Sequence, residues 1–198
     1  MNIGLTGGIA AGKSTVSQML VNRGAALIDA DVVAREIMEP GHPVLQRVVE
    51  RFGQEVLHED GTLDRKKLGS IVFSDPTQRK ALEEITHPAI RSEMREAMSR
   101  LEAENPGRLV IADIPLLYES GLENLYEEIM VVYVPREIQL DRLMQRDGLS
   151  LSGAEARLSA QMDIELKKQR ADIVIDNSYG FNETERQIDE FWRNKGLS

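Results

Sequence analysis

The chain has 198 residues, of which 41% are hydrophobic and 29% charged, and this balance excludes a wholly disordered protein. Its 33 acidic residues outnumber the 24 Lys and Arg residues, and the net charge of -9 opposes a broad nucleic-acid-binding surface. The absence of cysteine excludes disulfide scaffolds and thiolate metal sites. Because no signal peptide and no apolar run of transmembrane length is found, we expect a cytoplasmic protein that binds neither nucleic acid nor membrane.

Short apolar runs of strand length recur along the chain, at residues 3–5, 25–28, 109–114, 129–134 and 173–175. Continuous apolar runs suit parallel strands that are covered on both faces, and helical patterns separate them here. Two amphipathic stripes are expected to pack on the sheet, through Val16, Met19, Leu20, Ile188, Phe191 and Trp192. The sequence therefore predicts an α/β fold with a parallel sheet flanked by helices.

The segment from Gly7 to Ser14 follows the first apolar run, and its glycine, lysine and serine spacing is that of a phosphate-binding loop. The backbone N–H groups of such a loop and the positive end of the next helix hold the phosphates of a nucleotide. We expect Lys13 to reach the β- and γ-phosphates, Ser14 to bind Mg²⁺ and Thr15 to approach the α-phosphate. The residues assigned to ATP in this segment are Gly8, Ile9, Ala10, Ala11, Gly12, Lys13, Ser14, Thr15 and Val16.

Two carboxylates, Asp29 and Asp31, follow the second apolar run, at the strand end where α/β sheets bind ligands. A carboxylate there can orient an acceptor hydroxyl and take its proton, although positioning matters more than base strength in phosphoryl transfer. Asp31 can also be the N-cap of the next helix, and this role is compatible with catalysis. One of these two carboxylates can therefore face the acceptor hydroxyl.

Two insertions interrupt the predicted core, which consists of residues 1–30, 107–134 and 171–198. Residues 31–106 contain helical patterns and no strand-like run, and Pro88 is expected to end or kink a helix there. Residues 135–170 are also expected to be helical, with a capping box at Ser152 and Glu155.

Charged side chains at the end of the third apolar run and in the second insertion supply further candidates. Asp113 closes the third apolar run, where it either holds a Mg²⁺-bound water or only ends the strand. Arg142 and Arg146 are four residues apart, so they share one helix face and can converge on phosphates. The other basic residues are interpreted mainly as solvated helix charges: Arg136, Arg157, Lys167, Lys168 and Arg170.

Small-molecule kinases typically have a short core, an acceptor-binding insertion and an arginine-bearing lid. The lid excludes water from the site of phosphoryl transfer and neutralises the transferring group. A GTP switch is disfavoured, because no Asn-Lys-x-Asp element follows a later strand. Two alternatives stay open. The protein can be a P-loop kinase for another acceptor, such as a nucleoside, a nucleoside monophosphate or a small acid, or a regulatory protein that binds ATP without turnover.

Several motifs in order resemble those of the dephospho-coenzyme A kinase family. They are the phosphate loop, Asp29-Ala30-Asp31 with Arg35, His87-Pro88, Pro115-Leu116-Leu117 with Glu119, and Gln145-Arg146-Asp147. Their spacing matches over essentially the whole chain. The resemblance implies a P-loop NTPase-type sheet with a helical acceptor domain at 31–106 and a helical lid at 135–170. It also implies transfer of phosphate from MgATP to the ribose 3′-hydroxyl of dephospho-coenzyme A, the last step of coenzyme A synthesis.

The resemblance assigns roles to single residues. Asp31 would face the 3′-hydroxyl, Lys13 and Arg142 would flank the transferred phosphate, and Ser14 would bind magnesium. Asp113, proposed above from its place at the strand end, is the second metal candidate. The acceptor side would be formed by Asp31, Arg35, His87, Arg91, Leu116 and Leu117, and the ATP side would include Arg146 and Asn177, which begins the adenine-contacting loop. The chain departs from the family at Ala10-Ala11, where Gly-Ser is frequent, and at Tyr179, which separates Ser178 from Gly180. A monomer or a small homo-oligomer is expected.

Overall fold

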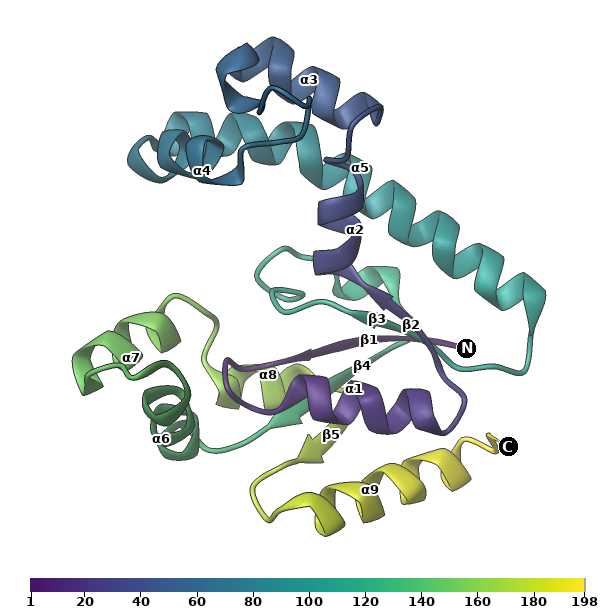
Figure 1. Ribbon diagram of the computed structural model, residues 1–198. Helices are drawn as coiled ribbons and strands as arrows, with labels where there is room; N and C mark the ends of the chain where they lie inside the picture. The colour runs from purple at the N-terminus through teal and green to yellow at the C-terminus, as the bar shows by residue number, and fades with distance from the viewer. Residues whose placement is uncertain (198) are drawn as a thin grey trace. The chain divides into compact units, whose positions relative to one another are not determined.

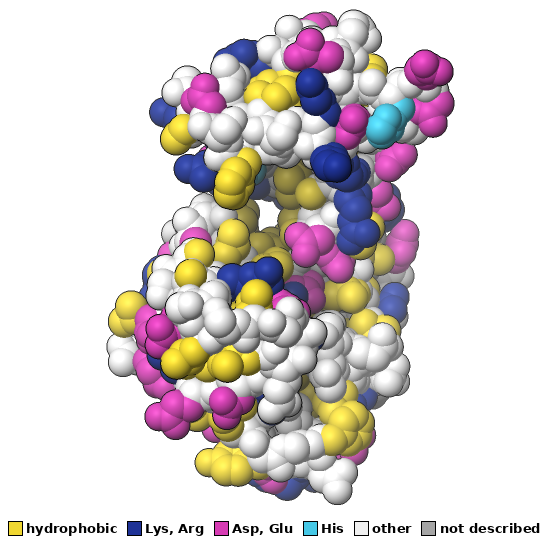
Figure 2. Space-filling model, turned by 60° about the vertical axis from the view of Figure 1, so that its left-hand side comes forward, with side chains coloured by type: hydrophobic (Ala, Val, Ile, Leu, Met, Phe, Trp, Pro, Cys, Tyr) yellow, Lys and Arg dark blue, Asp and Glu magenta, His cyan; other side chains and the backbone are white. Residues whose placement is uncertain are grey.

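The computed structural model describes residues 1–197, which form two compact units. The first, here called the core unit, contains Met1–Ile28 and the chain from Arg100 onward. The second, here called the helical unit, contains Asp29–Ser99. The boundaries predicted for the acceptor domain and the lid stay predictions. On the face drawn in Figure 2, acidic and basic side chains are interspersed.

A five-stranded parallel sheet in the order β2-β3-β1-β4-β5 lies at the centre of the core unit (Figure 1). In the register of this sheet, Leu5 lies opposite Asp113 and Gly7 opposite Val132. All five predicted apolar runs form strands, so the predicted parallel sheet is confirmed. The strands are β1 (Asn2–Gly7), β2 (Ala26–Asp29), β3 (Val110–Asp113), β4 (Glu128–Tyr133) and β5 (Ile173–Asp176).

The strand order creates a switch point between β1 and β3. From β1 the chain continues to β2 on one side of the sheet, whereas from β3 it crosses to β4 on the other side. Open α/β sheets bind ligands at the carboxyl ends of strands at such a point, because the connections diverge there and leave a crevice. The phosphate loop follows β1 and Asp113 ends β3, so both lie at this crevice.

Helices cover both faces of the sheet (Figure 1). On one face, α1 (Lys13–Asn22) and α9 (Phe181–Asn194) lie side by side, and on the other α8 (Ile164–Arg170) packs against β4. Both predicted stripes contribute to the core between the sheet and α1 and α9, as expected. The buried stripe residues are Val16, Met19, Leu20, Ile188 and Phe191, and Trp192 is partly buried at the edge.

A smaller hydrophobic cluster joins α6 (Arg136–Asp147) and α7 (Leu151–Ser159) to the phosphate loop. Its buried residues are Leu143, Ala154 and Leu158, and Ile9 and Ala10 of the loop pack against them. The helices that were predicted to form a lid therefore share apolar contacts with the phosphate loop.

The capping box predicted at Ser152 and Glu155 is wrong. Helix α7 begins after Ser150, whose hydroxyl accepts a hydrogen bond from the N–H of Gly153 at 3.2 Å. Ser150 has the extended backbone that an N-cap requires, whereas Ser152 already lies inside the helix.

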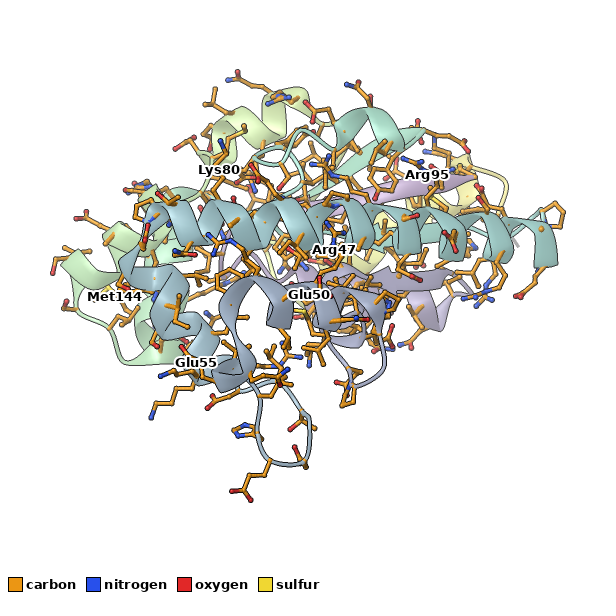
Figure 3. The ribbon with its side chains drawn as sticks, turned by 90° about the horizontal axis from the view of Figure 1, so that it is seen from above. Arg47, Glu50, Glu55, Lys80, Arg95 and Met144 are labelled. Carbon is orange, nitrogen blue, oxygen red and sulfur yellow. The ribbon has the colours of Figure 1, made fainter. Side chains whose placement is uncertain are left out.

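The helical unit contains α2 (Ala30–Glu36), α3 (Pro43–Phe52), α4 (Arg65–Ser74), most of α5 (Pro76–Glu104) and the short 3-10 helix η1 (Gln54–Val56). The helix α3, which carries Arg47 and Glu50, lies along α5 (Figures 1 and 3). At the start of α3, Nε2 of His42 lies 3.8 Å from Oε1 of Glu93 on α5. Residues 29–99 therefore pack as helices, as expected, with one isolated antiparallel bridge between Leu57 and Leu63.

Pro88 does not end a helix, because α5 continues through it over 29 residues. Proline removes one backbone donor and crowds the preceding turn, at a cost of about 3 kcal/mol. The remaining turns on both sides of Pro88 keep this long helix continuous. Among the helices of residues 1–197, none combines the length and the apolar character needed to cross a membrane.

Candidate active site

A cavity of about 650 Å³ opens at the carboxyl end of β1, where the phosphate loop enters α1. The loop after β3, the helix α6, the segment before α8 and the loop after β5 supply the rest of its wall. Two of the residues assigned to ATP, Ala11 and Val16, have buried side chains in the core instead. The cavity brings together Gly8, Ile9, Ala10, Gly12, Lys13, Ser14, Thr15, Arg142, Arg146 and Asn177.

The backbone of the phosphate loop depends on its glycines. Gly12 has a φ of +89°, and a Cβ there would collide with the side-chain amide of Asn177. A Cβ at Gly8 would collide with the side-chain amide of Gln139. Within residues 1–197, Ala10 is the only non-glycine residue with a positive φ, at +60°. Such left-handed backbone costs energy, and it is held here by the contacts around the loop.

Two glutamines hold the peptide groups of Ile9 in the phosphate loop. The side chain of Gln139, on α6, donates from Nε2 to Ile9 O at 2.8 Å. The N–H of Ile9 donates to Oε1 of Gln161 at 3.0 Å. Sequence reasoning missed both residues. The available signal was weak: Gln139 precedes Leu143 by four residues and so shares the buried face of α6.

Asn177 connects the phosphate loop to two other elements. Its Nδ2 donates to Ala11 O at 2.8 Å, and its Oδ1 accepts from the hydroxyl of Thr184 on α9 at 2.8 Å. Its backbone carbonyl accepts a hydrogen bond from Nη2 of Arg142 at 2.9 Å. The residue predicted to begin the adenine-contacting loop therefore also fixes the phosphate loop and an arginine of α6.

Lys13 and Asp113 form a hydrogen-bonded ion pair beside the phosphate loop. Asp113 is only 5% exposed, and a buried carboxylate requires a charged or hydrogen-bonding partner. It ends β3 directly opposite Leu5 of β1, which brings its side chain next to the loop that leaves β1.

Magnesium favours oxygen ligands and keeps most of its waters when phosphates are present. Ser14 lines the cavity, and the carboxylate of Asp113 is paired with Lys13, which also lines it. Over residues 1–197 no group of three or more His, Cys, Asp or Glu side chains could hold a metal ion by itself. The residues present therefore fit a nucleotide-bound Mg²⁺ with one or two protein ligands.

The arginines of α6, Arg142 and Arg146, both line the cavity. Arg146 is also paired with Asp147, at 2.7 Å between Nε and Oδ1 and 3.1 Å between Nη2 and Oδ2. This hydrogen bond lowers the pKa of Asp147 and raises the pKa of Arg146. Arg157 reaches the same carboxylate at 2.5 Å. The Arg146 head group is thus held by a neighbour, while Arg142 is held by the Asn177 carbonyl.

In the helical unit, the N-cap of α2 is Asp29 and not Asp31. Oδ1 of Asp29 accepts from the N–H groups of Asp31 at 2.8 Å and Val32 at 3.2 Å. The suggestion that Asp31 only caps the helix is therefore wrong. Asp31 lies in the first turn, and within residues 29–99 its carboxylate has no hydrogen-bond or ion-pair partner. Its backbone carbonyl accepts from Nε of Arg35 at 3.1 Å.

The other predicted acceptor residues differ in accessibility. His87 and Arg91 lie on α5 in the helical unit. Leu116 and Leu117 follow β3 in the core unit, where Leu116 is 44% exposed and Leu117 is fully buried. Leu116 is therefore accessible at the surface, whereas Leu117 is packed in the interior.

Lys167 was interpreted as a solvated helix charge, and this interpretation is wrong, because its side chain is fully buried. It follows the buried Ile164 by three residues on α8, so both lie on the face that packs on the sheet. That spacing was the only local signal of its position.

Comparison with known proteins assigns the chain to a family. The family model described as Dephospho-CoA kinase matches residues 1–183. The chain belongs to the dephospho-CoA kinase family. A dephospho-CoA kinase of Anaeromyxobacter dehalogenans is 53% identical to it over 176 residues, which are 89% of this chain and 83% of that protein.

Solved structures agree with this dephospho-CoA kinase family assignment. The structure of a dephospho-CoA kinase from Campylobacter jejuni matches with a TM-score of 0.77 and 36% identity, covering 98% of this chain and 96% of that one. A shikimate kinase from Bacteroides thetaiotaomicron matches with a TM-score of 0.51 and 15% identity, covering 100% and 99% of the two chains. The second likeness shows the P-loop kinase fold alone.

The family assignment confirms several predictions together. The resemblance, the P-loop kinase fold and the kinase class are as expected, and ATP is the co-substrate that a dephospho-CoA kinase implies. A regulatory protein without turnover and a kinase for another acceptor are correspondingly disfavoured. The cytoplasmic location, the oligomeric state and the roles of single residues stay predictions.

Proposed function

We propose that this chain transfers the γ-phosphate of ATP to the ribose 3′-hydroxyl of dephospho-coenzyme A, giving coenzyme A and ADP. The observation that carries this proposal is the cavity at the switch point, which gathers the phosphate loop, Lys13, Arg142 and Arg146. In a chain with a net charge of -9, such a local group of cations suits a triphosphate.

Each part of ATP has a partner in the cavity under this proposal. The N–H groups of the phosphate loop and Lys13 hold the β- and γ-phosphates, while the two arginines of α6 neutralise charge from the other side. The ring of Phe181 lines the cavity and is 58% exposed, which offers a flat apolar surface to the adenine beside Asn177.

The ion pair between Lys13 and Asp113 holds the lysine ammonium beside the phosphate loop before the nucleotide binds. A triphosphate carries more charge than one carboxylate, so Lys13 would turn from Asp113 to the phosphates when ATP binds. Ser14 and Asp113 would hold Mg²⁺, which neutralises charge on the β- and γ-phosphates when bound.

The acceptor hydroxyl is oriented by Asp31 in this proposal. Because Asp29 provides the helix cap, the Asp31 carboxylate can accept the proton of the 3′-hydroxyl as the new phosphoester bond forms. Arg35, His87, Arg91 and Leu116 are the proposed contacts for the rest of dephospho-coenzyme A.

The test compares two neighbouring carboxylates. Asp31→Asn is expected to lower kcat by about 100-fold or more, the usual contribution of a general base, with the ATP affinity unchanged. Asp29→Asn is the matched control, because asparagine caps helices as well as aspartate does and should leave turnover nearly intact. Near-normal turnover of Asp31→Asn would remove Asp31 from the mechanism.

The acceptor itself is tested by following ADP release and product formation with ATP, Mg²⁺ and one acceptor at a time. Dephospho-coenzyme A should be phosphorylated rapidly, and AMP, adenosine and shikimate should not. Efficient transfer to one of the other three acceptors, with none to dephospho-coenzyme A, would overturn the proposed substrate and keep the P-loop kinase class.

A further inference from the structure

The buried ammonium of Lys167 lies at the carboxyl ends of β1 and β3. It donates to Gly7 O at 3.3 Å and to Pro115 O at 3.2 Å, and it lies 2.9 Å from Oε1 of Glu119. A lysine ammonium has three N–H donors, so each donor has one acceptor here. Burial of a charge is tolerated when it is both paired and hydrogen-bonded, and Lys167 meets both conditions.

The two strands separate at the position of this ammonium. Their last register pair is Leu5 with Asp113, and their last backbone hydrogen bond runs from Ile114 N to Leu5 O at 2.9 Å. Carbonyl directions alternate along a strand, so Gly7 O points to the same side of β1 as Leu5 O. Since β3 ends at Asp113, the ammonium of Lys167 replaces the strand donor that Gly7 O would otherwise have.

The same ammonium holds the loop after β3 and the entry to α8. Pro115 O also accepts a hydrogen bond from the hydroxyl of Thr6 at 3.0 Å. Oε1 of Glu119 also accepts the N–H of Met162 at 2.9 Å, in the segment between α7 and α8. Lys167 therefore ties together the start of the phosphate loop, the loop after β3 and the segment that returns from α6 and α7.

We propose that Lys167 is a positioning residue for phosphoryl transfer. Its ammonium sets the spacing between Gly7 and residues 113–115, where Asp113 pairs with Lys13 and Pro115 lines the cavity. Because Lys167 is fully buried, it acts through these groups and does not touch a phosphate. The inference rests on the proposed placement of ATP at Lys13 and Asp113, and it names the residue that keeps the two sides of the crevice in place.

The first test is Lys167→Met, which removes the ammonium and keeps an unbranched apolar side chain. We expect kcat to fall about 100-fold, the effect of displacing reacting groups by roughly 1 Å, with a smaller rise in the KM for ATP. The matched control is Ile188→Ala, a fully buried change on α9 that lowers the melting temperature without touching this network. If Ile188→Ala lowers kcat as much as Lys167→Met does when the two variants have the same melting temperature, the positioning role of Lys167 is overturned.

A second test does not depend on the folding of Lys167→Met. The chain has no cysteine, so Lys167→Cys provides a single thiol that can be alkylated in denaturant before refolding. Reaction with 2-bromoethylamine gives a side chain of lysine length that ends in an ammonium, and reaction with 1-bromopropane gives a neutral one of similar length. We expect the first product to regain most of the wild-type kcat and the second to stay about 100-fold lower.

Equal kcat values for the ammonium and propyl products would overturn the inference, because the charge at Lys167 would then have no role. Wild-type protein carried through alkylation and refolding is the reference. Its activity toward dephospho-coenzyme A tests the proposed function independently, so a wrong substrate and a wrong role for Lys167 give different results.

Discussion

Replacing Asn177 by alanine is expected to destabilise the core unit and to loosen the phosphate loop. The change removes two side-chain hydrogen bonds, one to Ala11 O and one from the Thr184 hydroxyl, both 2.8 Å long. At about 1 kcal/mol for each bond, the free energy of unfolding should fall by about 2 kcal/mol. In a chain of this size each kcal/mol corresponds to about 2–4 °C, so the melting temperature should fall by about 4–8 °C.

A comparison with Thr184→Val separates the two bonds. This variant loses the hydroxyl, whose single proton is shared between Oδ1 of Asn177 and Gly180 O, but it keeps the hydrogen bond from Asn177 to Ala11 O. It should lose about 1 kcal/mol and keep a KM for ATP close to that of the wild type. Asn177→Ala should raise the KM for ATP, because the loop carbonyl of Ala11 then lacks its partner.

Thermal unfolding without ligand and steady-state kinetics with varied ATP are the two assays for these variants. The reasoning is refuted if Asn177→Ala lowers the melting temperature no more than Thr184→Val, since the bond to Ala11 would then contribute nothing. An unchanged KM for ATP in Asn177→Ala would refute the link between this bond and nucleotide binding.

Gly8→Ala places a methyl group against the Gln139 amide, so it should raise the KM for ATP. Adding Gln139→Ala to this variant should lower the KM part of the way back toward the wild-type value. A wild-type KM in Gly8→Ala would contradict the contact. Phe181→Ala should raise the KM for ATP in steady-state assays with little change in kcat, and an unchanged KM would remove the proposed adenine contact. The hydrogen bond to Glu165, together with burial, raises the pKa of Tyr133 from 10.0 to about 12. The folded state then binds more protons than the unfolded state between these values, so this contribution to stability is complete below pH 10 and is lost as the pH rises toward 12. Melting temperatures over this range should therefore fall more steeply for the wild type than for Tyr133→Phe, and parallel curves would contradict the assignment.

The phosphate loop and the sheet were predictable because their signals are local. The spacing of Gly7, Gly12 and Lys13 is set by the few residues that must surround a phosphate, and apolar runs report strands buried on both faces. Arg142 and Arg146 could be placed on one helix face by their separation alone, and both line the cavity.

Choices between neighbouring residues of the same type were less predictable. Asp29 and Asp31 are both suitable caps, and so are Ser150 and Ser152, but a cap requires extended backbone at its own position. That conformation depends on where the preceding strand or loop ends. The sequence therefore predicted that a helix starts near each of these pairs, but it placed the cap two residues too late, at Asp31 and at Ser152.

The sequence by itself determined the fold class, the nucleotide loop and the family resemblance, because periodicity and motif spacing act over a few residues. Only the tertiary structure decided that Lys167 is buried at the switch point, and that Gln139 and Gln161 hold the loop at Ile9. The partners of these side chains come from β1, the loop after β3 and the region of α6 to α8, which lie far apart in the chain. A lysine on a charged helix has the same local pattern in solvent and in a buried network, so its environment is set by which strand ends converge on it.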